Sequence, residues 1–459
     1  MENYPKLFSK IALSALSVLL VLSIVLPTVL QPIKASILGV VFFAIFGLLI
    51  SNKLKFSGAL YFYSCLFSLV GMIWSIYGEL AGNPGAIRVL TVMVVYPFIL
   101  PLCSVLYKKD HEQSLYNILL ISAWLIVILD LSYIMYSVFY PGNILQEFLR
   151  NLYADDAVVD NAESYFKFTL PNVSSIIFLL PFFISNLIFR NFKTNQKNIL
   201  LLIVLMLMVA LLSGRRGLLV SMLAGPMMAF ILTIGNLKAK FQTRRSFKLW
   251  KFLCVAMIFL LAAYLIVDSI GIQYYADTIN SIFDFTNNES NILRAEQFRA
   301  LLRGFFDAPF FGKGAGAVAD VIRSKETPWA YELFYVAAIF QYGLFAFIFY
   351  ATGIIFIAFY FRNIIKMKSR SSFEFYFLSG FISFFIASAT NPYIAKFDYM
   401  WVIFIPYAII NLKLIGKRFQ VPGLAGGSMD RSRRLLSQGE RISVHRQYKM
   451  SSNTVRKND

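Results

Sequence analysis

Residues suited to phosphate chemistry gather in a stretch of low hydropathy, residues 268–330, within an otherwise apolar chain. Arg294, Arg299 and Arg303 lie in this stretch, and Glu332 follows it at the start of the next apolar run. Guanidinium groups bind phosphate oxygens in a bidentate fork, and a carboxylate at such an edge can act as a general base. The competing interpretation is solvated loop arginines and an interfacial acid that pairs with one of them.

A second pair of cations, Arg215 and Arg216, stands in a turn of a few residues between two apolar runs. These side chains either extend toward lipid headgroups or form a phosphate clamp. Two groups of arginines from separate parts of the chain suit a ligand that carries a diphosphate. Fixed cations can stabilise a departing diphosphate without a metal.

Composition and hydropathy predict the elements that position these residues. The 459 residues are 58% hydrophobic and 15% charged, which excludes a soluble globular domain. Spans are predicted at residues 11–30, 36–50, 58–77, 89–107, 116–139, 173–189, 198–213, 218–235, 252–270, 331–360, 374–390 and 399–415. Because unpaired backbone groups are not tolerated in lipid, these runs must be helices. The fold class is therefore an all-α polytopic membrane protein with about twelve transmembrane helices.

The net charge of +19 follows topology and does not indicate nucleic-acid binding. Basic residues concentrate in segments that are cytoplasmic if both ends lie inside, as the positive-inside rule requires. The predicted organisation is a cytoplasmic N-terminus at residues 1–10, a membrane domain at 11–415 and a basic, disordered cytoplasmic tail at 416–459. Two long loops, about residues 140–172 and 271–330, are then extracytoplasmic.

The second of these loops is expected to carry a helix, since Leu293, Phe298, Leu301, Leu302 and Phe305 recur near helical spacing. Its apolar side suggests that it lies on the membrane surface. Pro309 and the glycines that follow are expected to end it in a flexible turn. Within the membrane, Asp130 is either a functional acid or a partner in a polar contact inside the bundle.

No cofactor or metal is predicted. Neither histidine falls on the predicted outer side, so no histidine cluster can hold zinc there. The three cysteines lie in apolar runs, which implies no disulfide framework.

Several short motifs in this order resemble the bacterial O-antigen polymerase and ligase superfamily of membrane glycan-assembly enzymes. They are Pro171-Asn172 entering a span, Gly214-Arg215-Arg216-Gly217, Arg294 with Pro309-x-x-Gly312-x-Gly314, and Glu332 ahead of Tyr342-Gly343. Asn391-Pro392 before the final span is also similar. Ligases of this group use a histidine in the long outer loop, where this chain offers Glu332, so the resemblance favours a polymerase.

The resemblance implies a metal-independent glycosyltransferase of the bacterial cytoplasmic membrane, with its site on the periplasmic face. It would transfer a growing glycan from undecaprenyl diphosphate onto a lipid-linked repeat unit. Glu332, Arg216 and Arg294 would be catalytic, and Arg215, Arg299, Arg303 and Asn172 would bind substrate. Membrane lipids, a chain-length regulator and a flippase are the implied partners.

Two other functions compete with a polymerase. A ligase would move the glycan onto lipid A core or another acceptor. A transporter or flippase would also have about twelve spans, but carriers tend to keep their charged sites at the midplane and in broken helices.

Overall fold

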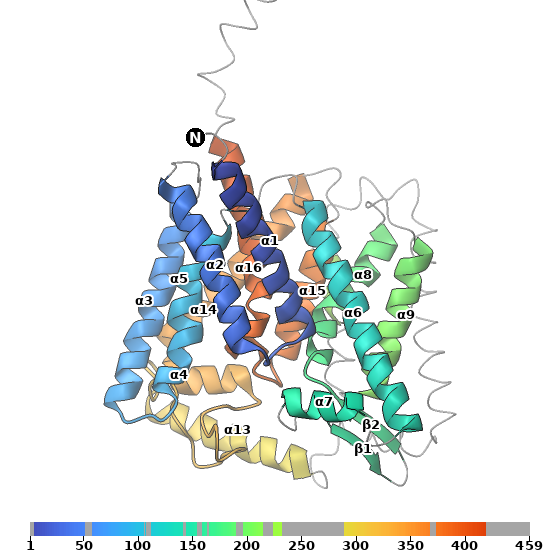
Figure 1. The fold of residues 1–459 in the computed structure, drawn as a ribbon. Coiled ribbons are helices and arrows are strands. Elements are labelled where there is room, and N and C mark those ends of the chain that lie inside the picture. Colours follow the sequence, from blue (N-terminus) through green and yellow to red (C-terminus); the bar gives the residue numbers. More distant parts are fainter. Residues whose placement is uncertain are drawn as a thin grey trace, which may run out of the picture. The chain divides into compact units, whose positions relative to one another are not determined.

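The computed structural model describes residues 4–50, 57–104, 106, 112–140, 144–153, 158–162, 165–189, 196–213, 224–231, 289–367 and 373–418 (Figure 1). The chain divides into two units, Met1–Asn411 and Leu412–Asp459, and the contacts described below lie within the first. Several predicted features lie outside the described residues. They are Arg215, Arg216, the apolar run 252–270, most of the run 218–235 and nearly all of the basic tail.

Helices make up most of this part of the chain. Six are long and apolar enough to cross a membrane: α1 (Tyr4–Val25), α2 (Gln31–Ile50), α3 (Gly58–Leu80), α6 (Glu112–Phe139), α14 (Phe334–Met367) and α16 (Trp401–Arg418). Shorter apolar helices occupy four more of the predicted runs: α4 (Ala86–Leu90) continuing through a π-helical turn (Thr91–Val95) into α5 (Tyr96–Ser104), α8 (Val173–Phe189), α9 (Gln196–Leu212) and α15 (Phe373–Ala387). A multi-pass helical protein is therefore confirmed, whereas the count of about twelve is not.

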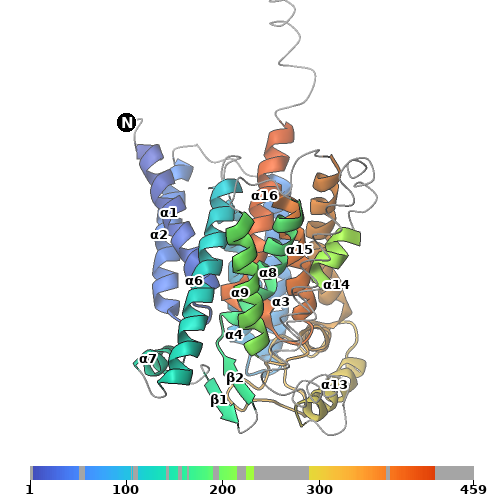
Figure 2. The ribbon, with the colours of Figure 1, turned by 90° about the vertical axis from the view of Figure 1, so that its right-hand side faces the viewer.

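The connections that were predicted to be extracytoplasmic gather at one end of the bundle, which we call the loop face (Figures 1 and 2). It carries α7 (Ile144–Tyr153), the strands β1 (Val158–Ala162) and β2 (Tyr165–Thr169), and α13 (Glu289–Asp307). The helix predicted in the second long loop is confirmed as α13, which runs across the ends of the spanning helices (Figure 1). The described parts of both long loops therefore lie at the same end of the bundle.

The hairpin of β1 and β2 was not predicted. The strands pair antiparallel, with Val158 opposite Thr169 and Ala162 opposite Tyr165. Valines in β1 and aromatic residues in β2 favour extended backbone, but strands this short give little periodic signal in a polar loop. The first outer loop therefore holds both a helix and a hairpin.

Aromatic side chains fill the centre of the bundle where α8 meets α15 and α16. Phe178 makes edge-on contacts with Phe377 and Trp401, at centroid distances of 4.9 and 4.7 Å. Gly380 lets the backbones of α15 and α8 approach, since a Cβ there would lie 2.6 Å from the carbonyl oxygen of Phe178. Small residues at such crossings are typical of membrane helix pairs.

Asp130, the acid in the middle of α6, is fully buried and accepts a hydrogen bond of 2.6 Å from Nδ2 of Asn172. Asn172 is also fully buried, in the turn that leads into α8. A hydrogen bond between two elements satisfies part of the polarity that each would otherwise bury in an apolar bundle. The sequence left two roles open for Asp130, a functional acid or a partner in a polar contact inside the bundle, and this hydrogen bond is such a contact.

A second buried polar cluster joins the turn between α1 and α2 to the segment before α16. The ammonium of Lys34 pairs with Oδ1 of Asp398 and donates to the carbonyl of Leu26 at 2.6 Å. Oδ2 of Asp398 accepts from the amide of Thr28 at 3.0 Å and from Nε2 of Gln31 at 2.7 Å. Because the charge of Lys34 is neutralised in this way, α2 begins at Gln31, several residues before the predicted start at residue 36. The first span likewise ends at Val25 and not at residue 30.

Replacing Asp398 with Ala is expected to lower the free energy of unfolding by about 3–5 kcal/mol, because it leaves a buried ammonium without its counter-ion. Asp307→Ala is the control, since the ion pair of Asp307 with Lys313 is exposed, and such pairs contribute about 1 kcal/mol or less. Thermal unfolding in detergent measures both. Equal effects of the two substitutions would contradict the role of the buried pair.

The long helix α14 is broken at Gly343, where φ is 66° and ψ is −178°. The residues before the break, Phe334–Tyr342, form a short arm, and the residues after it continue as the spanning part. A break in a transmembrane helix leaves backbone groups unpaired, which is tolerated only when other parts of the protein satisfy them. The segment that follows α13 does so.

This segment, residues 309–316, we call the glycine clasp. The amides of Leu344 and Phe345 donate to the carbonyls of Pro309 and Phe310, at 2.9 and 3.2 Å. In return, the amides of Lys313 and Gly314 donate to the carbonyls of Phe340 and Gln341, at 2.9 and 3.0 Å. Backbone hydrogen bonds thus cross the break in both directions.

The other side of the clasp contacts α3 and the turn after it. The amide of Ala315 donates to the carbonyl of Trp74, and Nε1 of Trp74 donates to the carbonyl of Phe311. Gly312, Gly314 and Gly316 all have φ between 70° and 90° and lie against neighbouring backbone. The predicted turn is therefore present, but it is held by backbone hydrogen bonds, with Gly312 and residues 314–316 buried.

Gly343→Ala is expected to lower the free energy of unfolding by at least about 2 kcal/mol. A positive φ is unfavourable for alanine, and its Cβ would lie 2.4 Å from the carbonyl oxygen of Phe310. Gly39→Ala in α2 is the matched control, since a Cβ there meets nothing within 4 Å and alanine favours helix. The melting temperatures of the purified variants test this difference. A Gly343→Ala protein as stable as Gly39→Ala would refute the clasp.

Candidate active site on the loop face

The structure brings Glu332 together with two arginines on the loop face. Nε of Arg294 lies 2.6 Å from Oε2 of Glu332, and Nη1 of Arg323 lies 2.5 Å from the same oxygen. The Glu332 side chain is 13% exposed, whereas those of Arg294 and Arg323 are 35% and 43% exposed. The carboxylate is therefore largely covered while the guanidinium groups still reach solvent. Its other oxygen, Oε1, takes part in neither ion pair.

Arg294 lies on the side of α13 that packs against the rest of the protein. Counting by helical turns, Arg294 shares this side with Gln297 and Leu301, both of which are fully buried. Leu301 packs with Ala317, Tyr331, Ala337 and Phe340 in one apolar cluster. This cluster ties α13 to the short arm of α14.

Hydrogen bonds on both sides of Glu332 in the sequence hold its position. The hydroxyl of the preceding Tyr331 is buried and accepts a hydrogen bond from the amide of Ala319. Burial raises the pKa of the Tyr331 phenol above its usual value, so this group stays protonated near neutral pH. On the other side, the amide of Phe334 donates to the carbonyl of Glu332 at 2.9 Å.

Arg299 and Arg303 do not join this cluster. They lie on the opposite side of α13 from Arg294 and both are exposed. Among the described residues, neither has an ion-pair partner. Of the three arginines predicted in this loop, the structure thus brings only Arg294 to Glu332.

Of the remaining candidates, the structure places only Asn172. Asn172 is bonded to Asp130 in the interior of the bundle, and Arg215 and Arg216 lie outside the described residues. In place of these, the structure adds Arg323, which was not predicted. It comes from a short segment of mixed residues with no helical or strand period, so only the tertiary contact identifies it.

The cluster combines the groups that transfer from a diphosphate leaving group requires. A carboxylate can accept a proton from an attacking hydroxyl, and two partly exposed guanidinium groups beside it can bind phosphate oxygens. The site lies just before the first residues of a membrane-spanning helix, so a lipid-anchored substrate can present its polar end there. These features define a multi-pass membrane protein with a charged site at one end of its helical bundle.

Comparison with known families agrees with this description. Residues 201–351 match the family model described as O-Antigen ligase, which supports the resemblance to the O-antigen polymerase and ligase superfamily. The matched segment contains Arg294, Arg323 and Glu332, together with Arg215 and Arg216. No curated protein matches the chain.

Proposed function

We propose that this protein is a surface-polysaccharide polymerase of the O-antigen type. It transfers a growing glycan from undecaprenyl diphosphate onto a lipid-linked repeat unit at the outer face of the bacterial cytoplasmic membrane. The observation that carries the proposal is the position of Glu332 between Arg294 and Arg323 on the loop face. A chain-length regulator and a flippase are the expected partners.

In the proposed reaction, a hydroxyl oxygen of the acceptor attacks the anomeric carbon of the donor glycan. The bond between that carbon and the diphosphate oxygen breaks, and its electron pair leaves with the lipid diphosphate. Glu332 accepts the hydroxyl proton. Arg294 and Arg323, with Arg215 and Arg216, neutralise the charge that develops on the diphosphate, and no metal is required for that step.

The two ion pairs of Glu332 give this mechanism an order of events, in which the donor binds before Glu332 acts as a base. A diphosphate carries more charge than a carboxylate and offers several oxygens to each guanidinium, so it competes with Glu332 for both arginines. When the donor binds, Arg294 and Arg323 turn to the diphosphate and Glu332 is released as a base. The empty site thus keeps its base paired until substrate arrives.

A ligase remains the alternative, because the family model that matches residues 201–351 is described as O-Antigen ligase. A polymerase is favoured because this chain has the carboxylate of Glu332 at the place where ligases of this group carry a histidine. The only histidines of the chain are His111 and His445, and neither falls in the loop that contains the site. A flippase is less favoured because the arginine and glutamate cluster lies at one end of the bundle.

Reconstitution of the full-length protein in proteoliposomes with a lipid-linked repeat unit tests the proposal. The expected product is a ladder of longer glycans that forms equally well in the presence of a chelator. Transfer only to added lipid A core would identify a ligase. Movement of the repeat unit across the bilayer without elongation would identify a transporter and overturn the proposal.

A further inference from the structure

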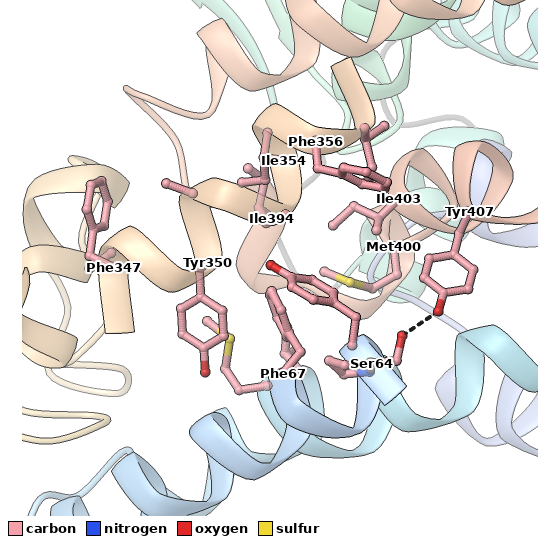
Figure 3. A pocket seen from close by; sticks show the side chains of 18 of the residues that line it. Ser64, Phe67, Phe347, Tyr350, Ile354, Phe356, Ile394, Met400, Ile403 and Tyr407 are labelled. Carbon is pink, nitrogen blue, oxygen red and sulfur yellow. Dashed lines mark hydrogen bonds between the residues drawn. The ribbon is translucent and has the colours of Figure 1, made fainter. Parts of the chain in front are cut away.

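An apolar cavity of 170 Å³ lies between α3, the π-helical turn with α5, α14 and α16 (Figure 3). Each spanning helix contributes one stripe to its wall, for example Phe347, Tyr350, Ala351 and Ile354 from α14, and Ile403, Tyr407 and Ile410 from α16. None of its lining residues is charged. A cavity of about 150 Å³ with such a lining stays dry and accepts apolar ligands.

Four of the six hydroxyl groups in the wall, those of Tyr63, Ser64, Tyr335 and Tyr407, form hydrogen bonds within the protein, and the surface that the cavity exposes is almost entirely carbon. The hydroxyl of Ser64 donates to that of Tyr407 at 2.8 Å (Figure 3). The hydroxyl of Tyr335 donates to the carbonyl of Phe385 at 2.5 Å, and that of Tyr63 to the carbonyl of Phe349 at 3.3 Å. The cavity therefore selects an apolar occupant.

The shape of the cavity suits a chain more than a compact ligand. One stripe of lining residues extends from Met400, just before α16, to Ile410 within it, and another extends along α14 beyond the break, from Phe347 to Ile357. At 1.5 Å per residue, each stripe covers about 15 Å, which is roughly half of the hydrocarbon thickness. Phe356, at the edge of the lining, is 48% exposed, so the cavity also meets the surface that faces lipid.

One end of this cavity lies next to the candidate active site. Phe334 and Tyr335 line it, and they are the second and third residues after Glu332. The site's carboxylate thus lies two residues before the short arm of α14, and the arm itself forms part of the cavity wall. A ligand with a charged head and an apolar chain would place the two parts in these two places.

We infer that the cavity holds the polyprenyl chain of the lipid diphosphate whose head is bound by Arg294 and Arg323. This inference rests on the proposed function and deepens it by assigning the lipid part of the substrate. Nine of the 23 lining residues are aromatic, and ring faces pack well against the flat, branched double-bonded units of a polyprenyl chain. A straight phospholipid acyl chain is the competing occupant.

Filling the cavity tests the inference through its dependence on chain length. Ala351→Phe in the reconstituted protein is expected to raise the KM for a donor with the full-length polyprenyl chain by about tenfold or more. The KM for a donor with a chain of only two prenyl units is expected to stay unchanged. Ile355→Phe, which adds a ring on the exposed side of α14, is the control. Ile403→Phe repeats the test from the opposite wall if the first variant is unstable.

A binding measurement separates this inference from the proposed function. A polyprenyl diphosphate of full length that carries a photoreactive group along its chain is expected to label peptides of α14 and α16 in the wild-type protein, and Ala351→Phe is expected to abolish the label. Equal effects on both donors, or labelling that phospholipid removes as well as polyprenyl phosphate does, would overturn the inference. If the label behaves as expected but no donor is elongated, the cavity assignment holds and the polymerase proposal fails.

Discussion

Replacing Glu332 with Gln is expected to reduce polymer formation by a factor of about 10²–10⁴, the usual contribution of a general base. Glutamine keeps the shape of the side chain and one oxygen for Arg294 and Arg323, so the fold and the loop face should persist. It cannot accept the proton of the acceptor hydroxyl at neutral pH. The rate of ladder formation by the reconstituted protein is the measurement.

Glu326→Gln is the matched control for this variant, since it changes another acid of the same loop whose side chain is exposed. It is expected to leave the rate within about twofold, as most surface substitutions do. Thermal unfolding of both variants shows whether they fold alike. If Glu332→Gln elongates glycans at the normal rate, Glu332 is not the base and the mechanism must be abandoned.

The second large effect is expected from the two arginines that contact Glu332. Arg294→Ala and Arg323→Ala should each lower the maximal rate by about 10²–10³, because each removes a donor that stabilises the departing diphosphate. Lysine at either position should recover only part of the loss, since it binds phosphate as a point charge. Steady-state rates with saturating donor provide the test.

Arg299→Ala and Arg303→Ala are the informative comparisons for these variants. Both residues lie on the exposed side of α13, away from Glu332, so we expect at most an increase in the KM for the donor. A loss of maximal rate in Arg299→Ala as large as that in Arg294→Ala would show that the active site includes the other side of α13.

Hydropathy predicted the helical membrane domain because spans must satisfy their own backbone in lipid. It placed helix ends less well where a charge is neutralised by a distant partner. Lys34 interrupts the apolar run before residue 36, yet the helix includes it because Asp398, more than 360 residues away, is its counter-ion. Such a pairing leaves no local signal in the sequence.

The candidate site was predicted only in part, because contacts between distant residues leave no local signal in the sequence. The type and place of Arg294 and Glu332 were evident from the chain, and the structure brings them into contact. Arg323 was missed because a single arginine in an irregular segment looks like any solvated loop residue. The contact of Asn172 with Asp130 likewise depends on how α6 and α8 pack, and helical period alone does not encode it.

The glycine clasp has a consequence for how the site opens and closes. Many enzymes enclose their substrates by loops that swing on glycine hinges over microseconds to milliseconds. Here the glycine clasp is held by backbone hydrogen bonds across the break at Gly343, so we expect that residues 309–316 do not act as a hinge. Access to Glu332 then depends on rotation of the Arg294 and Arg323 side chains, which takes picoseconds to nanoseconds for exposed groups. Movement of the glycine clasp should therefore not limit the turnover rate.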